Sequence, residues 1–281
     1  MARMDLVIQA PDIDTPQIKQ LARLAGADAI TALSAASTQA FRLSPARSEG
    51  VAELCAAAGI DFGFVPDGQR LDRVRLVAMD MDSTLISIEC IDEIADLQGI
   101  KPEIAAITAS AMRGEIDFRE SLTRRVALLA GLDIAALARV YDERLRLSPG
   151  AEQILAGFAR AGAKTLLVSG GFTFFTERLK ARLGLDHAVA STLEIAGGRL
   201  TGRISGEIVD GQVKAAAFAR LGRELKGDDG LIVAIGDGAN DLPMLRLADV
   251  SVAYHAKPIV REETTYAIDY CGLDAILNLF T

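Results

Sequence analysis

Short apolar runs, each ending in a turn, recur along the chain after residue 73. They lie at 74–79, where only Arg75 is charged, at 165–168 and at 231–235. Each is followed by a turn with glycine or aspartate and then by a helical pattern. A mostly apolar run indicates a strand that is buried on both faces, which is typical of parallel sheets. The repeated order of strand, loop and helix predicts an α/β fold with a doubly wound parallel sheet.

Two segments depart from this pattern. Between 88 and 147 there is no strand signal and apolar residues recur at helical spacing, so we expect a helical cap inserted at about 88–148. Between 191 and 211, apolar and polar residues alternate on both sides of Gly197-Gly198, which predicts a β-hairpin.

A different pattern occupies the first 71 residues, where strand-like runs alternate with helical stretches. The strand-like runs lie at 6–8, 39–43 and 62–65, and the helical stretches lie at 15–25 and 48–58. This pattern predicts a small α+β unit. Turn residues at 66–68 and the polar run through Arg73 indicate a boundary, so we expect one domain at 1–71 and a second at 72–281.

The composition of the 281-residue chain is that of an ordinary globular protein, with 50% hydrophobic and 24% charged residues. Its formal net charge is -8 and its cations form no stripe, so we expect no nucleic acid partner. The apolar run at 76–79 is too short to span a bilayer, and Asp5 stands where a signal peptide needs an apolar run. We therefore expect a cytoplasmic protein with no membrane partner.

Cysteine and histidine give no sign of carrying the chemistry. The three cysteines are widely separated and form no CxxC pair, which indicates buried thiols and neither a disulfide framework nor a zinc site. Neither of the two histidines has another histidine at ligand spacing. We therefore expect carboxylates to perform any acid–base chemistry.

Carboxylates stand directly after two of the expected strands. Asp80 and Asp82 follow the run at 74–79, and Asp237 follows the run at 231–235. Ligands of such sheets bind outside the carboxyl ends of the strands, so we expect these acids to gather there as a hard oxygen site suited to Mg²⁺. Beside such an ion, one carboxylate can attack phosphorus, and a second acid can protonate the leaving alkoxide and then deprotonate water.

Each chemical element has a plainer interpretation when it is taken alone. Residues 80–82 would be a solvated turn, and residues 236–241 a glycine turn in which Asp241 caps the next helix. Ser169-Gly170-Gly171 would hold phosphate oxygens with a hydroxyl and backbone N–H groups, or would be a common turn. Lys214 would neutralise the phosphate and the nucleophile, or would be a surface lysine.

These four elements, in this order, resemble the haloacid dehalogenase superfamily over residues 74–281. The residues within and around these motifs resemble the branch of that superfamily that hydrolyses free phosphoserine. The matching positions are Asp80–Thr84 (DMDST), Glu89, Met112–Gly114, Phe118–Leu122, Arg125, Ser169–Phe172 (SGGF) and Gly236–Leu245 (GDGANDLPML).

The resemblance implies a role for each catalytic position and implies Mg²⁺ as the cofactor. Asp80 would be the nucleophile and a metal ligand. Asp82 would be the acid–base and would lend its backbone carbonyl to the metal. Asp237 would complete the protein's share of the magnesium shell, and Asp241 would orient Lys214 and the metal-bound waters.

Substrate recognition is implied in the same way. The contacts to the phosphate or nearby substrate atoms would come from Ser169, Gly170, Lys214 and Asn240. Glu89 would receive the ammonium of the substrate and Arg125 its carboxylate. Met112 and Phe118 would line the cap side of the pocket. Without the resemblance, Glu89 would be a first-turn helix acid and Arg125 a solvated neighbour of Arg124.

The implied activity is Mg²⁺-dependent hydrolysis of O-phospho-L-serine to L-serine and phosphate, the last step of serine biosynthesis. Two alternatives stay open. The same site would act on another small phosphomonoester, by hydrolysis or by transfer to an alcohol, or the chain would be an amino-acid sensor with a vestigial phosphatase site. The domain at 1–71 resembles the ACT-type regulatory domains, and a dimerisation or packing module is the alternative, so amino-acid binding there and a homodimer both stay open.

Overall fold

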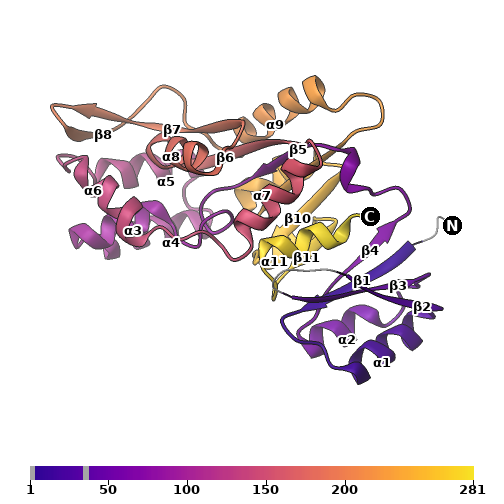
Figure 1. Cartoon of the computed structure of the whole chain (residues 1–281). Coiled ribbons are helices and arrows are strands. Elements are labelled where there is room, and N and C mark those ends of the chain that lie inside the picture. Colours follow the sequence, from indigo (N-terminus) through magenta and orange to yellow (C-terminus); the bar gives the residue numbers. More distant parts are fainter. Residues whose placement is uncertain (1–3, 34–37) are drawn as a thin grey trace. The chain divides into compact units, whose positions relative to one another are not determined.

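The computed structural model describes residues 4–33 and 38–281. The chain divides into two compact units. Of the described residues, one unit holds 4–33, 38–77, 148–164 and 221–281, and the other holds 78–147 and 165–220. Figure 1 labels most of the helices and strands from which the units are built.

Among the described residues, seven strands form one sheet in the order β11-β10-β9-β5-β6-β7-β8. Their bounds are β5 (Val74–Met79), β6 (Lys164–Phe172), β7 (His187–Ala196), β8 (Arg199–Ser205), β9 (Leu231–Gly236), β10 (Val250–Tyr254) and β11 (Tyr266–Ile268). The pairs β6/β7, β9/β10 and β10/β11 are parallel. The strands β5, β9 and β10 are almost wholly buried, as their apolar runs predict. The expected α/β fold with a parallel sheet is confirmed.

Helices lie before, between and after the strands of this sheet along the chain. Their bounds are η1 (Leu71–Arg73), α7 (Ala151–Arg160), α8 (Thr173–Leu183), α9 (Gly211–Leu225), η3 (Ala239–Asp241), α10 (Leu242–Leu245), α11 (Pro258–Glu262) and η4 (Leu273–Leu279), where η1, η3 and η4 are 3-10 helices. Within residues 4–33 and 38–281, no helix combines the length and the apolar character that crossing a membrane requires.

The strand β6 is longer than the apolar run that predicted it. The run ends at Val168, whereas the strand continues to Phe172, with an irregularity in its pairing with β7 between Ser169 and Phe172. The expected turn directly after Val168 is therefore wrong. Serine and glycine are weak strand formers, so residues 169–171 gave no sign that the strand continues through them. The helix α8 begins at Thr173, immediately after this irregular strand end.

The expected hairpin between 191 and 211 is confirmed. The strands β7 and β8 pair antiparallel, and Ala196 lies opposite Arg199 across a two-residue turn. Gly197 and Gly198 both have positive φ, at +57° and +76°. Two consecutive left-handed residues define the turn that best matches the twist of a hairpin, and glycine adopts this conformation without strain.

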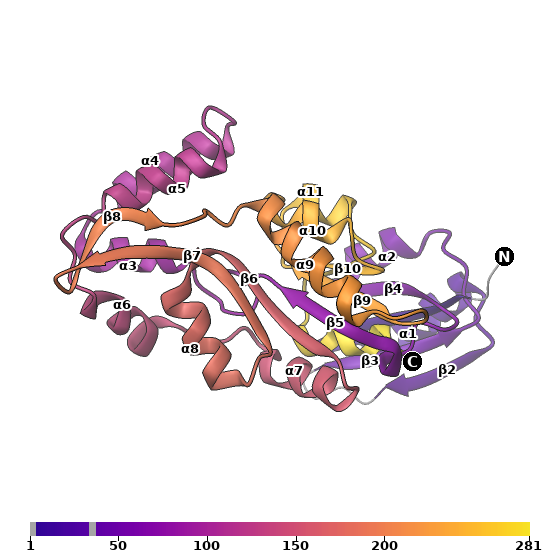
Figure 2. The same cartoon turned by 90° about the horizontal axis from the view of Figure 1, so that it is seen from above.

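The segment expected to be helical is built from α3 (Cys90–Gln98), α4 (Lys101–Met112), α5 (Phe118–Ala127), α6 (Ala135–Arg139) and the π-helical turn η2 (Val140–Arg144). The apolar positions that predicted these helices are buried, namely Ile91, Ile94, Ala95, Leu122, Val126 and Leu129. The helix α4 packs against α3 and α5, and α5 packs against the strand β8 (Figure 2). The limits of this segment as a cap domain stay a prediction.

Within residues 4–33 and 38–66, four strands form an antiparallel sheet in the order β2-β3-β1-β4. The elements are β1 (Met4–Ala10), α1 (Thr15–Ala25), β2 (Ala29–Leu33), β3 (Gln39–Ser44), α2 (Val51–Ala58) and β4 (Asp61–Pro66). The sequence pattern missed β2, because this edge strand is largely exposed and has no buried face to impose an alternation. It also placed the start of α2 three residues early. The likeness to ACT-type domains stays a prediction.

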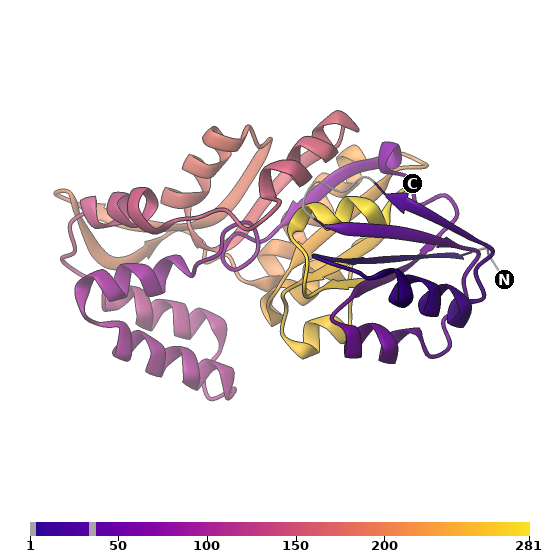
Figure 3. The same cartoon turned by 60° about the horizontal axis from the view of Figure 1, so that its bottom comes forward.

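Both faces of this sheet are covered. Leu6 and Ile8 belong to a core shared with α1 and α2. On the other face, Gln9 accepts a hydrogen bond from the side-chain amide of Asn278 at 2.8 Å. The helices α1 and α2 lie on one side of the sheet and η4 lies on the other (Figures 1 and 3). Burial on both faces explains why β1 reads as a nearly continuous apolar run.

The C-terminal segment is bound to this sheet by polar contacts and by one close approach. The carboxylate of Asp61 accepts hydrogen bonds from the N–H groups of residues 269–271 at 2.7 to 3.3 Å. The side chain of Gln69 donates to the carbonyl oxygen of Leu279 at 2.7 Å. A Cβ atom on Gly63 would lie 2.7 Å from the ring of Tyr266, so only glycine fits there without a shift.

We expect Gly63→Val to lower the free energy of unfolding by about 1 to 3 kcal/mol, because the added side chain has to displace the ring of Tyr266. Urea denaturation followed by far-UV circular dichroism measures the change. Ala32→Val, in the exposed strand β2, is the matched control and should leave the midpoint of urea denaturation unchanged. An unchanged midpoint for Gly63→Val would mean that the two segments do not pack this closely in solution.

Candidate active site

A tight turn follows β5 and holds the first two expected acids. The N–H of Leu85 donates to the carbonyl oxygen of Asp80 at 3.3 Å, and the N–H of Ile86 donates to that of Met81 at 2.9 Å. Ser83 has a positive φ of 55°, which is uncommon for a residue other than glycine. Such a conformation persists only where its surroundings determine it, so the geometry of this turn is tightly specified.

Lys214 contacts the first acid of the turn. Its Nζ lies 2.8 Å from Oδ1 of Asp80, and its side chain is fully buried. The same oxygen accepts the N–H of Met81 at 2.7 Å. A buried ammonium group requires an opposite charge, and Asp80 supplies one. Lys214 is therefore not the surface lysine that the sequence left open as an alternative.

Asp82 is bound on both of its carboxylate oxygens. Oδ1 accepts the N–H of Cys90, the first residue of α3, at 2.9 Å, and Oδ2 lies 3.5 Å from the hydroxyl of Ser169. Burial, and then the negative charge of Glu89, raise the pKa of Asp82 well above its usual range. A carboxyl group that holds its proton toward neutral pH is suited to donate it to a leaving group.

The irregular end of β6 brings a hydroxyl and backbone close to Asp82. The buried hydroxyl of Ser169 accepts the N–H of Gly171 at 2.8 Å. A Cβ atom on Gly171 would lie 2.8 Å from Oδ2 of Asp82, and one on Gly170 would lie 2.7 Å from the ring of Phe118. Both glycines are therefore required for these close approaches.

The residues expected to bind an amino acid lie around the same carboxylates. Glu89 accepts a hydrogen bond from the hydroxyl of Ser83 at 2.8 Å. The Nε atom of Arg125 is buried and has no hydrogen-bond partner among the described residues. Burial lowers the pKa of Arg125, and the nearby carboxylates of Asp92, Glu89 and Asp82 partly offset this effect. Met112, expected on the cap side of the pocket, is 69% exposed.

Sequence reasoning assigned no role to two residues that contact the expected site. Ser83 lies inside the DMDST motif, and its hydrogen bond to Glu89 follows from the turn. The N–H of Cys90 holds Asp82, and any residue at this position other than proline would supply that donor, so its side chain gives no signal. Position within the motif was the only available indication of Ser83.

The loop after β9 is compact. The buried carboxylate of Asp241 accepts the N–H of Gly238 at 3.1 Å. A Cβ atom on Gly236 would lie 2.6 Å from this carboxylate, so the backbone passes directly against it. Asp241 makes no side-chain capping bond to the next helix, α10, so the capping alternative is wrong for that helix.

Acidic side chains follow two strands of the sheet. Asp80 is the residue after β5, and Asp237 and Asp241 lie on the loop that follows β9. Carboxylate oxygens are the ligands that Mg²⁺ prefers in proteins, and the ion takes few of them. The donor set fits such an ion.

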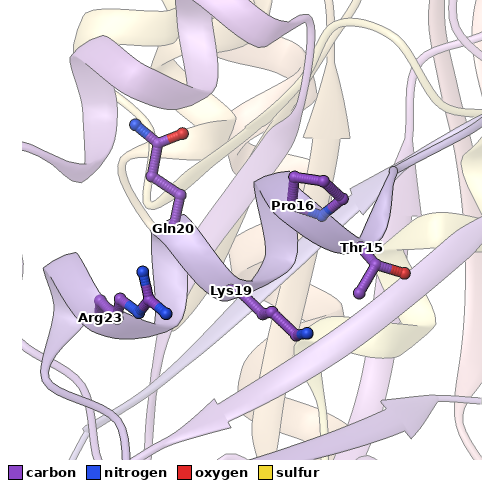
Figure 4. A pocket seen from close by; sticks show the side chains of 5 residues that line it. All are labelled: Thr15, Pro16, Lys19, Gln20 and Arg23. Atoms are coloured by element: carbon purple, nitrogen blue, oxygen red, sulfur yellow. The ribbon is translucent and has the colours of Figure 1, made fainter.

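A hollow on the N-terminal unit offers no comparable chemistry. It has a volume of about 470 Å³ and is lined by Thr15, Pro16, Lys19, Gln20 and Arg23, shown in Figure 4. All of the lining residues are exposed and belong to the single helix α1. The hollow is therefore open surface beside a helix, and amino-acid binding by this unit stays a prediction.

Two family models match the chain. Residues 77–246 match the haloacid dehalogenase-like hydrolases. Residues 6–54 match a domain of unknown function. The first match contains every catalytic, metal and substrate position expected from the sequence.

Named relatives agree with that match. The chain is 52% identical over 215 residues to the phosphoserine phosphatase of a Polaromonas species, which covers 75% of this chain and 91% of the relative. The structure of an unliganded probable phosphoserine phosphatase from Vibrio cholerae is similar with a TM-score of 0.84 at 34% identity, over 98% of this chain and 85% of that one. A phospho-aspartyl intermediate analogue of phosphoserine phosphatase is similar with a TM-score of 0.68 at 36% identity, over 74% of this chain and 100% of that one.

We expect Gly171→Ala to reduce phosphatase activity, because the added methyl group has to displace the carboxylate of Asp82. A displacement of a reacting group by about 1 Å can lower the rate by about 100-fold, and we expect a loss of that size. Steady-state hydrolysis of p-nitrophenyl phosphate measures the loss, and circular dichroism checks that the variant folds. Gly222→Ala, in α9, is the matched control, because its methyl group meets only the tip of Ile232 at 3.2 Å. Wild-type activity in Gly171→Ala would show that the close approach to Asp82 is not needed.

Proposed function

The chain belongs to the haloacid dehalogenase-like hydrolases, and we propose that it hydrolyses O-phospho-L-serine to L-serine and phosphate through a phosphorylated Asp80, with Mg²⁺ as its cofactor. Its relatives are named phosphoserine phosphatase, and it is an enzyme of that kind. The observation that carries the mechanism is the buried contact of Lys214 with Asp80, beside Asp82 and Ser169. We place the reaction at the last step of serine biosynthesis.

Asp80 acts as the nucleophile in this proposal. Its Oδ1 is held by the ammonium group of Lys214 and by the N–H of Met81, and these contacts fix the orientation of the carboxylate at the end of β5. A carboxylate fixed in this way approaches phosphorus in one geometry, which lowers the entropy lost in the transition state. The phosphorus–oxygen bond that forms on Asp80 replaces the bond to the serine oxygen, which leaves as the alcohol.

The metal would be held by Asp80 and Asp237, with the backbone carbonyl of Asp82 as a further ligand. The positions of Asp80 directly after β5 and of Asp237 directly after β9 support this assignment, because carboxylate oxygens are the ligands that Mg²⁺ prefers. When bound, Mg²⁺ offsets the repulsion between these carboxylates and the phosphate oxygens and so stabilises charge in the transition state. Asp241 orients Lys214 in this proposal, and both residues are fully buried.

Asp82 acts as the acid and then as the base. Its proton, retained because burial and Glu89 raise the pKa, passes to the oxygen of the departing serine. The resulting carboxylate then takes a proton from the water that attacks the phosphoenzyme. The hydroxyl of Ser169, the backbone of Gly170 and the side chains of Lys214 and Asn240 hold the phosphate oxygens throughout.

Glu89 and Arg125 recognise the amino-acid part of the substrate. An unpaired buried donor such as Nε of Arg125 costs about 1 to 3 kcal/mol, and a substrate carboxylate would remove that cost by accepting its hydrogen bond. The substrate ammonium would lie against Glu89, which the hydroxyl of Ser83 orients. A carboxylate that binds the ammonium group and a guanidinium that binds the carboxylate would together select a zwitterionic substrate.

We expect Asp80→Asn to abolish formation of the phosphoenzyme and Asp82→Asn to let it accumulate. The nitrophenolate of p-nitrophenyl phosphate leaves without a proton, so phosphorylation of Asp80 does not need Asp82 as an acid. Hydrolysis of the phosphoenzyme does need Asp82 as a base, and general base catalysis accelerates such a step by about 10²- to 10⁴-fold. Quenched-flow mixing followed by intact-protein mass spectrometry measures the phosphorylated fraction.

A chelator should suppress the phosphoenzyme in the Asp82→Asn variant, and added Mg²⁺ should restore it. Glu103→Gln, at an exposed position of α4 outside the proposed machinery, is the control for a changed charge. Turnover by Asp80→Asn at the wild-type rate would rule out the covalent mechanism.

We expect Arg125→Ala to raise KM for O-phosphoserine by about 10- to 100-fold, which corresponds to the loss of one hydrogen bond to a charged group. Hydrolysis of p-nitrophenyl phosphate should be unaffected. O-Phosphoethanolamine, which lacks the carboxylate, should be a poor substrate of the wild type, and the variant should hydrolyse it as well as the wild type does.

Arg124→Ala is the matched control, because Arg124 lies beside Arg125 and pairs with Glu120 on the surface of α5. Equal losses on all three substrates would mean that Arg125 does not recognise the carboxylate, and would favour another small phosphomonoester as the substrate.

A further inference from the structure

An ion pair links the helix that carries Arg125 to the helix that carries Lys214. Nε of Arg119, in the first turn of α5, lies 2.5 Å from Oδ2 of Asp210, the residue before α9. The two partners are 91 positions apart in the sequence. Arg119 is 48% exposed and Asp210 is 17% exposed, so the contact is partly shielded from water.

Asp210 also sets the start of α9. Its Oδ1 accepts the N–H groups of Gln212 and Val213, both at 3.0 Å, which is the arrangement of a helix N-cap. Its carbonyl oxygen accepts the N–H of Lys214 at 2.9 Å, the first bond of the helix. Burial alone would raise the pKa of Asp210, but the hydrogen bonds from Val213 and Arg119 outweigh it and hold the pKa low. The partner of Arg119 is therefore an ionised carboxylate one helical turn before the lysine that contacts Asp80.

The residue next to Arg119 makes a second contact of the same helix. The ring of Phe118 lies against Gly170, where a Cβ atom would be 2.7 Å from it. The carbonyl oxygen of Val209 lies 3.4 Å from that same position, so Phe118, Gly170 and Val209 are neighbours. Arg125 follows two turns later on α5. The first turn of α5 is thus held at the phosphate loop and at the start of α9.

We propose that Arg119 and Asp210 form a latch between α5 and α9, which keeps the substrate-recognising face of α5 in register with the catalytic lysine. Arg119 is then a positioning residue and touches no substrate. The inference rests on the proposed function, because it assigns Arg125 to the substrate carboxylate. The latch therefore affects the affinity for the amino-acid part of the substrate through the position of α5, although neither Arg119 nor Asp210 contacts the substrate.

We expect Arg119→Gln to raise KM for O-phosphoserine about two- to fivefold, the range for a partly exposed ion pair. The value of kcat should stay within about twofold, because the residues that perform the chemistry are unchanged. Arg119→Lys should recover most of the loss. The difference between Arg119→Gln and the wild type should shrink at high salt, because salt screens the pair.

A double-mutant cycle separates a latch from a general effect on the fold. Asp210→Asn keeps a capping side chain for α9 and removes the charge, and it should raise KM as Arg119→Gln does. Adding Arg119→Gln to Asp210→Asn should then change nothing further. Arg124→Gln, on the same helix, is the matched control and should behave as the wild type. Fully additive effects of the two changes would overturn the latch.

Hydrogen exchange gives a readout that does not depend on the substrate. The amides of α5 should exchange faster in Arg119→Gln than in the wild type and in Arg124→Gln. Unchanged exchange would overturn the latch whatever the enzyme hydrolyses. Faster exchange with an unchanged KM for O-phosphoserine would overturn its role in binding. Wild-type protein that does not hydrolyse O-phosphoserine would instead refute the proposed function, and the exchange experiment would still decide the latch.

Discussion

The buried contact between Lys214 and Asp80 is the constraint on which the rest of the site depends. Removing two charges from water is costly, and leaving either one unpaired would cost more, so the two side chains have to meet. They meet only if α9 starts where it does, and that start is fixed by the hydrogen bonds of Gln212 and Val213 to Asp210. The end of β5 and the beginning of α9 are therefore held together by electrostatics as well as by packing.

The parts of the structure that could be predicted are those in which burial imposes a repeating pattern on the sequence. The runs at 74–79 and 231–235 are apolar because their strands are covered on both faces, and their ends placed Asp80 and Asp237 in advance. The turn of the hairpin could be predicted because Gly197-Gly198 lies between two segments in which apolar and polar residues alternate. Roles for individual side chains came from the resemblance of the motifs and not from these patterns.

The parts that escaped prediction lack such a pattern. The strand β2 is exposed, so nothing in its sequence had to alternate. Lys214 was expected at the site only from the resemblance of the motifs, because the carboxylate that compensates its charge lies far away in the sequence. The pair of Arg119 and Asp210 is hidden for the same reason. Long-range electrostatic contacts leave no periodic signal, and only the tertiary structure reveals them.

The sheet of residues 4–33 and 38–66 is covered on one face by a segment that is translated much later than the sheet itself. Its strands and the helices α1 and α2 can assemble as soon as they leave the ribosome, because domains generally fold in the order of synthesis. The opposite face, with Gln9 and Gly63, stays uncovered until Tyr266 and Asn278 arrive. A nascent chain of this protein thus carries a half-covered sheet through most of its translation.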